Sequence, residues 1–188
     1  LELEFTAGEG PVIHNPLRTA ADVDRVRELD DVDRLGFVMD TVAATRAGLD
    51  DSIPVIGFAG APFTLAGYCI EGGTSKAWTL TKSFMYRHES AWHDLCDRLA
   101  RAVSLYLMAQ LDAGAQIVQL FDSWVGCLGP DDYRRYVLPH ARTAIAAAAA
   151  RAPVIHFATG NPQLLPLLRE AGGSVIGIDW RIDLDRGW

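Results

Sequence analysis

Four short apolar segments, separated by longer stretches with helical periodicity, define the hydrophobic pattern of this chain from residue 52 onward. They are SIPVIGFAG, AQIVQLFDS, PVIHFATG and SVIGIDW (residues 52–60, 115–123, 153–160 and 174–180). Each is a largely continuous apolar run rather than an alternating one, which is typical of strands buried on both faces of a parallel sheet. The pattern therefore predicts four buried parallel strands.

Helices are predicted between these strands. Residues 82–113 have apolar side chains at core spacing, with a break expected near residues 87–90 and an end at Gly114. Another helix is predicted over 130–152, opened by a proline, and a third over 161–173.

Ahead of the first strand the pattern is less regular. Residues 1–20, which include the turn-rich GEGP and NPLR, fit a surface crossing or a short extended segment. Residues 19–30 and 35–50 have helical spacing, and the first of these begins with a threonine suited to a cap.

The alternation of strands and helices is typical of an α/β protein with a parallel sheet. An open doubly wound sheet usually carries a G-x-G-x-x-G turn after a strand, and the sequence has none. A (β/α)8 barrel needs eight strand–helix units and about 250 residues. We therefore expect a TIM barrel of which this chain, residues 1–188, supplies roughly half as one incomplete domain; an open four-stranded sheet is the alternative. The start at Leu1 and the end just after the fourth strand fit a chain cut at both ends.

Composition and charge narrow the functional classes. The chain is 49% hydrophobic and 22% charged, which is ordinary for a globular protein, and its net charge of −7 argues against a nucleic-acid-binding surface. No apolar run is long enough for a membrane span, and no secretion signal is recognised. The cysteines, Cys69, Cys96 and Cys127, are widely spaced and fit reduced thiols, so a cytoplasmic location is expected.

Candidate chemistry lies where the predicted strands end, because both architectures bind ligands at the carboxyl ends of parallel strands. Tyr68 could donate its hydroxyl group to an anionic ligand, or be a half-buried core tyrosine. Ser123 could act as a hydroxyl donor or as a turn serine. It lacks the G-x-S-x-G surroundings of a nucleophile, so we do not expect it to attack a substrate.

Other polar and aromatic residues at these ends allow two interpretations. His156, flanked by apolar residues, is more typical of a core histidine than of a site residue, and Asp179 fits either a site acid or a cap. Phe58, Phe63 and Phe121 could form an apolar wall, although core packing would also explain them. The residues alone thus predict a largely apolar pocket with few charged groups.

Several of these stretches together resemble one family. GFAGAPFTLAGYCIEGG, GAQIVQLFDSWVGCLGP, PVIHFATG and VIGIDWR, in this order and spacing, closely resemble uroporphyrinogen decarboxylase, and GEGPVIHNPLRTAADVDRV resembles the segment leading into that family's barrel. The resemblance covers essentially the whole chain but only about the middle half of a family member. It implies a cofactor-free TIM barrel, usually a homodimer, that removes four acetate carboxyl groups from uroporphyrinogen to give coproporphyrinogen in haem biosynthesis.

The resemblance also implies roles for individual residues. Tyr68 matches the family's tyrosine that reaches toward the tetrapyrrole, Ser123 its hydroxyl partner for a substrate carboxylate, and Phe58 and Phe121 its cleft-lining aromatics. The family's N-terminal arginines, its catalytic aspartate and its C-terminal histidine have no counterpart in this chain. The catalytic residue is therefore not assigned, and the segment alone is expected to be inactive.

Two other functions remain as alternatives. Zinc-dependent methyltransferases of the same superfamily, which act on corrinoid or thiol substrates, carry a His-x-Cys motif near a strand end. The matching stretch here is His156-Phe157-Ala158, with alanine in place of the cysteine, so no metal is expected. The other alternative is a non-catalytic scaffold that binds a tetrapyrrole.

Overall fold

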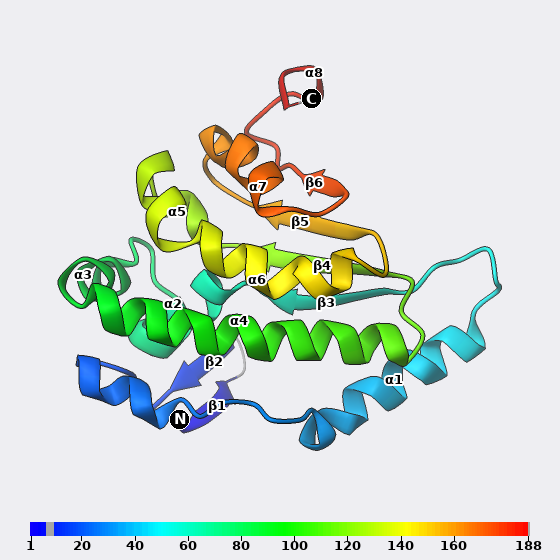
Figure 1. Ribbon diagram of the computed structural model, residues 1–188, viewed down its shortest axis with the longest axis horizontal. Helices are drawn as coiled ribbons and strands as arrows, with labels where there is room; N and C mark the ends of the chain where they lie inside the picture. The colour runs from blue at the N-terminus through cyan, green and yellow to red at the C-terminus, as the bar shows by residue number, and fades with distance from the viewer. Residues whose placement is uncertain (7–9, 188) are drawn as a thin grey trace.

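The computed structural model describes residues 1–6 and 10–187, and a parallel sheet forms its centre (Figure 1). The sheet consists of β3 (Ile56–Gly60), β4 (Ile117–Asp122), β5 (Val154–Ala158) and β6 (Val175–Gly177), hydrogen-bonded in this order and all parallel. The four predicted parallel strands are confirmed.

Helices connect the strands and precede them. They are α1 (Gly36–Gly48), α2 (Pro62–Glu71), α3 (Thr79–Arg87), α4 (Glu89–Asp112), α5 (Pro130–Tyr136), α6 (Leu138–Ala149), α7 (Leu165–Ala171) and α8 (Leu184–Gly187). Short 3-10 turns lie at Ala20–Arg25, Asp33–Leu35, Val125–Cys127 and Pro162–Leu164. The predicted break near residues 87–90 is confirmed, because α3 and α4 meet at His88.

One of the two hydrophobic core clusters lies between the sheet and the helices on one side of it. Figure 1 shows α4, α6 and α7 running along the near side of the strands. Val118, Leu120 and Val154 are fully buried there, packed in one cluster with side chains of α4 and α6. The opposite face of the sheet is uncovered: Phe58 is 60% exposed and Val175 47% exposed. The expectation that these strands are buried on both faces is therefore wrong within this chain, because its helices cover only one.

The N-terminal region differs in detail from the prediction. Strands β1 (Leu3–Thr6) and β2 (Gly10–Ile13) form an antiparallel hairpin, which agrees with the predicted short extended segment. Residues 8 and 9 of the predicted GEGP turn lie outside the described residues. The helix predicted over residues 19–30 is only the 3-10 turn Ala20–Arg25, because the chain becomes extended at Val26, whose carbonyl accepts a hydrogen bond from Arg98.

The helix predicted over residues 130–152 is divided in two. The backbone leaves helical geometry at Val137, between α5 and α6. Pro139 explains the division, because proline has no N–H to donate to the carbonyl group four residues earlier, at Arg135, and its ring crowds that carbonyl group.

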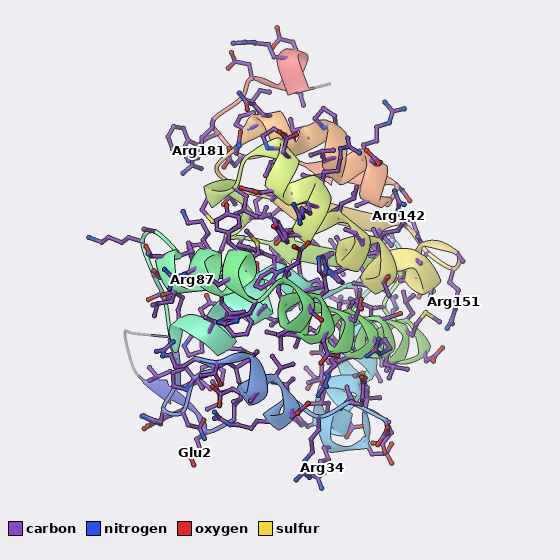
Figure 2. All side chains as sticks on the ribbon, turned by 60° about the vertical axis from the view of Figure 1, so that its left-hand side comes forward. Glu2, Arg34, Arg87, Arg142, Arg151 and Arg181 are labelled. Carbon is purple, nitrogen blue, oxygen red and sulfur yellow. The ribbon has the colours of Figure 1, made fainter. Side chains whose placement is uncertain are left out.

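Charged side chains lie at the outside of the molecule. Figure 2 shows the following labelled residues, all of them exposed: Glu2, Arg34, Arg87, Arg142, Arg151 and Arg181. Among the described residues, no helix is long and apolar enough to cross a membrane.

Candidate functional site at the carboxyl edge of the sheet

Three phenylalanines line the uncovered face of the sheet near its carboxyl edge. Phe121 on β4 is in register with Phe157 on β5, and Phe58 lies on the same face of β3. The ring centroids are 5.8 Å apart between Phe58 and Phe121 and also between Phe121 and Phe157, with nearly perpendicular ring planes. The structure thus brings together the predicted Phe58 and Phe121, and Phe157 extends their row to a third strand.

Two other phenylalanines near the strand ends have different environments, and for Phe63 the structure supports the core-packing alternative. Phe63 is not part of the row: this residue lies on α2, is 1% exposed and packs against Trp92 in the core. Phe157 was not predicted, although, like Phe121, it is the next-to-last residue of its strand. Gly177 gives Phe157 its space, because a Cβ atom at Gly177 would lie 2.6 Å from the Phe157 ring.

The backbone of Phe58 is held by a buried amide from α4. Gln110 accepts a hydrogen bond from the Phe58 N–H (2.9 Å) and donates one to the Phe58 carbonyl oxygen (3.0 Å). Gly57 allows this approach, since a Cβ there would lie 2.8 Å from the Gln110 amide oxygen. Gln110 therefore fixes one end of the phenylalanine row.

Tyr68 lies on α2, a helix that is not among those predicted from the sequence. Helix α2 begins at Pro62, which suits a first turn, and ends at Gly72 in the left-handed conformation with φ of 89°. The Tyr68 side chain is half-buried, and its hydroxyl group has no hydrogen-bond partner among the described residues. A ligand that bound this hydroxyl group would therefore not have to displace a described hydrogen-bond partner.

Ser123 lies in the turn that follows β4 and is half-buried. Its carbonyl oxygen accepts a hydrogen bond from the Thr159 hydroxyl group (2.7 Å), which ties this turn to the loop after β5. The two loops also touch at Gly126, where a Cβ would lie 2.1 Å from the Thr159 carbonyl oxygen. The position of Ser123 is therefore fixed by contacts between loops as well as by its own strand.

Asp179 lies in the loop after β6 and connects that loop to the loop after β5. Its carboxylate accepts hydrogen bonds from the Gly160 N–H and the Arg181 N–H, each at 2.9 Å, and forms an ion pair with the Arg181 guanidinium. Of the two predicted roles for Asp179, the structure supports that of a capping residue.

His156 and Asp122 both point toward the helices and are fully buried, away from the phenylalanine row. The His156 Nδ1–H donates to the Leu168 carbonyl oxygen (3.3 Å), and burial lowers the pKa of this histidine to about 4, so it is a neutral core residue near pH 7. Burial raises the pKa of Asp122 to about 7. Its Oδ1 accepts a hydrogen bond from Thr64 (3.4 Å), whereas its Oδ2 has no partner among the described residues.

The geometry does not favour a zinc site. In the part of the chain that the structure describes, no group of three His, Cys, Asp or Glu residues is placed to hold a metal ion. Ala158 occupies the position of the cysteine, and His156 is buried on the side of the sheet that faces the helices.

The fold and this site define a class: an α/β protein with half of a (β/α)8 barrel and an open aromatic face at the carboxyl edge of its sheet. A solved methyltransferase from Methanosarcina mazei has the same fold over 93% of this chain and 51% of its own, with a TM-score of 0.66 and 14% sequence identity.

Sequence comparison then gives the family. The uroporphyrinogen decarboxylase family model matches residues 1–187, and this chain belongs to that family. It is 49% identical to a uroporphyrinogen decarboxylase of Chloroflexus aggregans, covering 100% of this chain and 54% of the relative. It is 50% identical to that of Sorangium cellulosum, covering 98% and 53%. The chain spans about half the length of these curated relatives.

Proposed function

We propose that this chain forms one half of the barrel of a uroporphyrinogen decarboxylase and supplies one wall of its substrate cleft. The observation that carries the proposal is the row Phe58, Phe121 and Phe157 on the uncovered face of the sheet, in a chain that belongs to this family. Flat aromatic and apolar surfaces suit a large tetrapyrrole, since ligand sites are mostly apolar with a few placed polar groups.

The polar groups of this wall would orient the substrate. Tyr68 and Ser123 would donate hydrogen bonds to carboxylates on the tetrapyrrole. Such hydrogen bonds to charged groups are stronger than neutral ones, and they fix orientation. The described strand residues on the uncovered face carry no formal charge, so the groups that bind most of the negative charge would come from outside this chain.

The substrate itself would provide the electron sink. Protonation of a pyrrole ring next to its acetate arm allows the electron pair of the breaking C–C bond to move into the ring as CO2 leaves. The carbon that loses CO2 then takes up a proton and becomes a methyl group. The ring gives up the proton that it first accepted, so one proton is consumed for each CO2 released. The protein would orient the ring and stabilise the cationic intermediate, without a cofactor. The residue that stabilises that intermediate is not assigned within this chain.

The resemblance to the family supports a proposal for the state of the whole protein. We expect a cytoplasmic homodimer that acts in haem biosynthesis on a small-molecule tetrapyrrole, with no nucleic-acid partner. We also expect the isolated 188-residue chain to be inactive, because it supplies only one wall of the cleft. Coproporphyrinogen formed by the isolated chain would contradict this expectation.

A direct assay tests the proposal. The full-length protein is incubated anaerobically with uroporphyrinogen III, and the products are oxidised and separated by chromatography; coproporphyrin is the expected end product. Tyr68→Phe should lower kcat/KM by about tenfold or more, as expected for the loss of a hydrogen bond to a charged group. Tyr106→Phe is the matched control, because Tyr106 lies on α4 among side chains of the core. The absence of any decarboxylated product would refute the proposed function.

A further inference from the structure

Two tryptophans from separate segments pack against Tyr68. The ring centroid of Trp78 lies 5.8 Å from that of Tyr68, and the centroid of Trp124 lies 6.3 Å away, both in edge-to-face geometry. The two indoles also contact each other, with centroids 5.1 Å apart and planes inclined by 32°. Tyr68 thus belongs to a three-ring cluster, Tyr68, Trp78 and Trp124, whose members come from α2, the segment before α3 and the turn after β4.

Trp78 occupies its place at a conformational cost. Its φ of 53° is the only positive φ of a non-glycine residue in the described part of the chain, and its side chain is 2% exposed. Left-handed geometry is unfavourable for a bulky residue and persists only when the surroundings enforce it. The N–H of Trp78 donates to the Ser75 hydroxyl oxygen (3.1 Å), which helps to hold this conformation.

Helix α2 is shaped to receive the Trp78 indole. A Cβ atom at Gly67 would lie 2.9 Å from Cζ3 and 3.1 Å from Cε3 of Trp78, so only glycine allows the ring to lie directly against the helix beside Tyr68. The contact with Gly67 therefore determines how close the Trp78 indole lies to the Tyr68 ring.

Trp124 connects the cluster to the second candidate residue, because it directly follows Ser123. Its Nε1 is buried and has no hydrogen-bond partner among the described residues, so ring packing holds this side chain. The contacts of the Tyr68 ring with both indoles restrict the rotation of that ring, and with it the direction in which the Tyr68 hydroxyl group points.

We propose that Trp78 and Trp124 are positioning residues, which orient the Tyr68 hydroxyl toward the substrate and couple the position of α2 to that of Ser123. The proposal rests on the proposed function. Its physical reason is that a hydrogen bond to substrate depends steeply on angle and distance, so a small rotation of the Tyr68 ring reduces turnover.

A double-mutant cycle in the full-length protein tests the coupling. Trp78→Phe and Trp124→Phe should each lower kcat/KM by about tenfold when Tyr68 is present. In the Tyr68→Phe background, each should change kcat/KM by less than about twofold, because the hydroxyl group that they orient is already gone. A merely structural role predicts similar losses in both backgrounds, and that result would overturn the proposal.

A milder substitution than the tryptophan replacements tests the same contact in case those variants fail to fold. Gly67→Ala should displace the Trp78 indole and lower kcat/KM, again only when Tyr68 is present. Gly48→Ala, at the end of α1, is the matched control, because a Cβ atom at Gly48 would have no neighbour within 4 Å and activity should be unchanged. The stacked indoles should also give an exciton signal in circular dichroism that Gly67→Ala weakens and Gly48→Ala does not.

The outcomes separate the two proposals. A full-length protein without decarboxylase activity would overturn the proposed function and, with it, this inference. An active protein in which the tryptophan and tyrosine substitutions have independent effects would overturn the inference alone. An unaltered circular dichroism signal in Gly67→Ala would show that the indoles are not held as described.

Discussion

The Asp122 carboxyl group is fully buried beside the candidate site, one residue before Ser123. It faces the helices, where Thr64 donates its only described hydrogen bond, and the buried hydroxyl group of Tyr133 also lacks a partner among the described residues. A buried carboxylate without a cation is unfavourable, so the folded state favours the protonated acid. This residue should therefore reduce the stability of the protein as the pH approaches neutrality.

The expected sign follows from the raised pKa. Asp122 has a pKa of about 7 when folded, above its ordinary value of 3.8, so the folded state binds the proton more tightly than the unfolded state. The free energy of unfolding should therefore fall as the pH rises from about 4 to about 7 and change little from this group above pH 7. Asp122→Asn removes the titrating group. The free energy of unfolding of this variant, relative to that of the unmodified protein, should therefore rise between about pH 4 and about pH 7, by at most about 4 kcal/mol.

Urea unfolding of both proteins between pH 4 and 8, followed by tryptophan fluorescence, measures the difference. Asp40→Asn, which changes an exposed acid on α1, controls for the loss of one negative charge. A difference between Asp122→Asn and the unmodified protein that does not vary with pH would contradict the assignment.

At the scale of elements, the strands were predictable and some helices were not. Continuous apolar runs identify β3 to β6 without any knowledge of their partners. The sequence did not predict helix α2, because small residues such as Gly67 are typical of loops. In the structure Gly67 makes room for the indole of Trp78, which lies eleven positions later in the chain. Non-local packing of this kind leaves no periodic pattern in the sequence.

The residues of the candidate site were also only partly predictable from the sequence. Phe58 and Phe121 could be predicted because each lies near the end of a strand, and the resemblance to a family supplied their role. For Phe63 the sequence left an apolar wall and core packing open. The structure supports core packing, because the chain changes from strand to helix between Phe58 and Phe63. The link from Thr159 to Ser123 could not be predicted, because it joins two loops whose relative placement only the folded sheet determines.

The contact between these loops leads to a prediction about Gly126. A Cβ atom there would lie 2.1 Å from the Thr159 carbonyl oxygen and 2.8 Å from the Gly160 Cα, both of which are backbone atoms. Gly126→Ala must therefore push the loops after β4 and β5 apart. We expect the free energy of unfolding to fall by about 1–3 kcal/mol, as in other overpacked sites, and kcat/KM to fall as Ser123 shifts.

Gly129→Ala is the matched control in the same loop, because a Cβ at Gly129 has no neighbour within 4 Å and the φ of this residue is −80°. Denaturant unfolding and the decarboxylase assay would be performed on both variants. Equal stability and activity of the two variants would mean that the loops are not in the contact described.

At the scale of the whole molecule, the sheet has one covered and one open face. The apolar runs predicted strands buried on both sides, whereas in this chain only the side toward α4 and α6 is covered. The family barrel resolves this difference, because the second face of each strand points into the interior of a (β/α)8 barrel. The sequence pattern thus corresponds to the complete barrel rather than to the half that this chain forms.

The open apolar face should make the isolated chain self-associate and bind hydrophobic dyes. Exposed apolar patches of this kind promote association and bind hydrophobic dyes. The isolated 188-residue chain should therefore enhance the fluorescence of anilinonaphthalene sulfonate more than the full-length protein does at equal molarity, and should self-associate in sedimentation experiments. Phe58→Ser should reduce both effects, because Phe58 is 60% exposed on that face.

Phe37→Ser separates this open face from general surface hydrophobicity. Phe37 is 67% exposed but lies on α1 and not on a strand of the sheet, so its replacement should leave dye binding and association nearly unchanged. Far-ultraviolet circular dichroism and a cooperative urea transition would establish that each variant is folded. Equal effects of the two substitutions would show that the chain does not associate through the open face of the sheet. The rest of the barrel would then not be needed to cover that face.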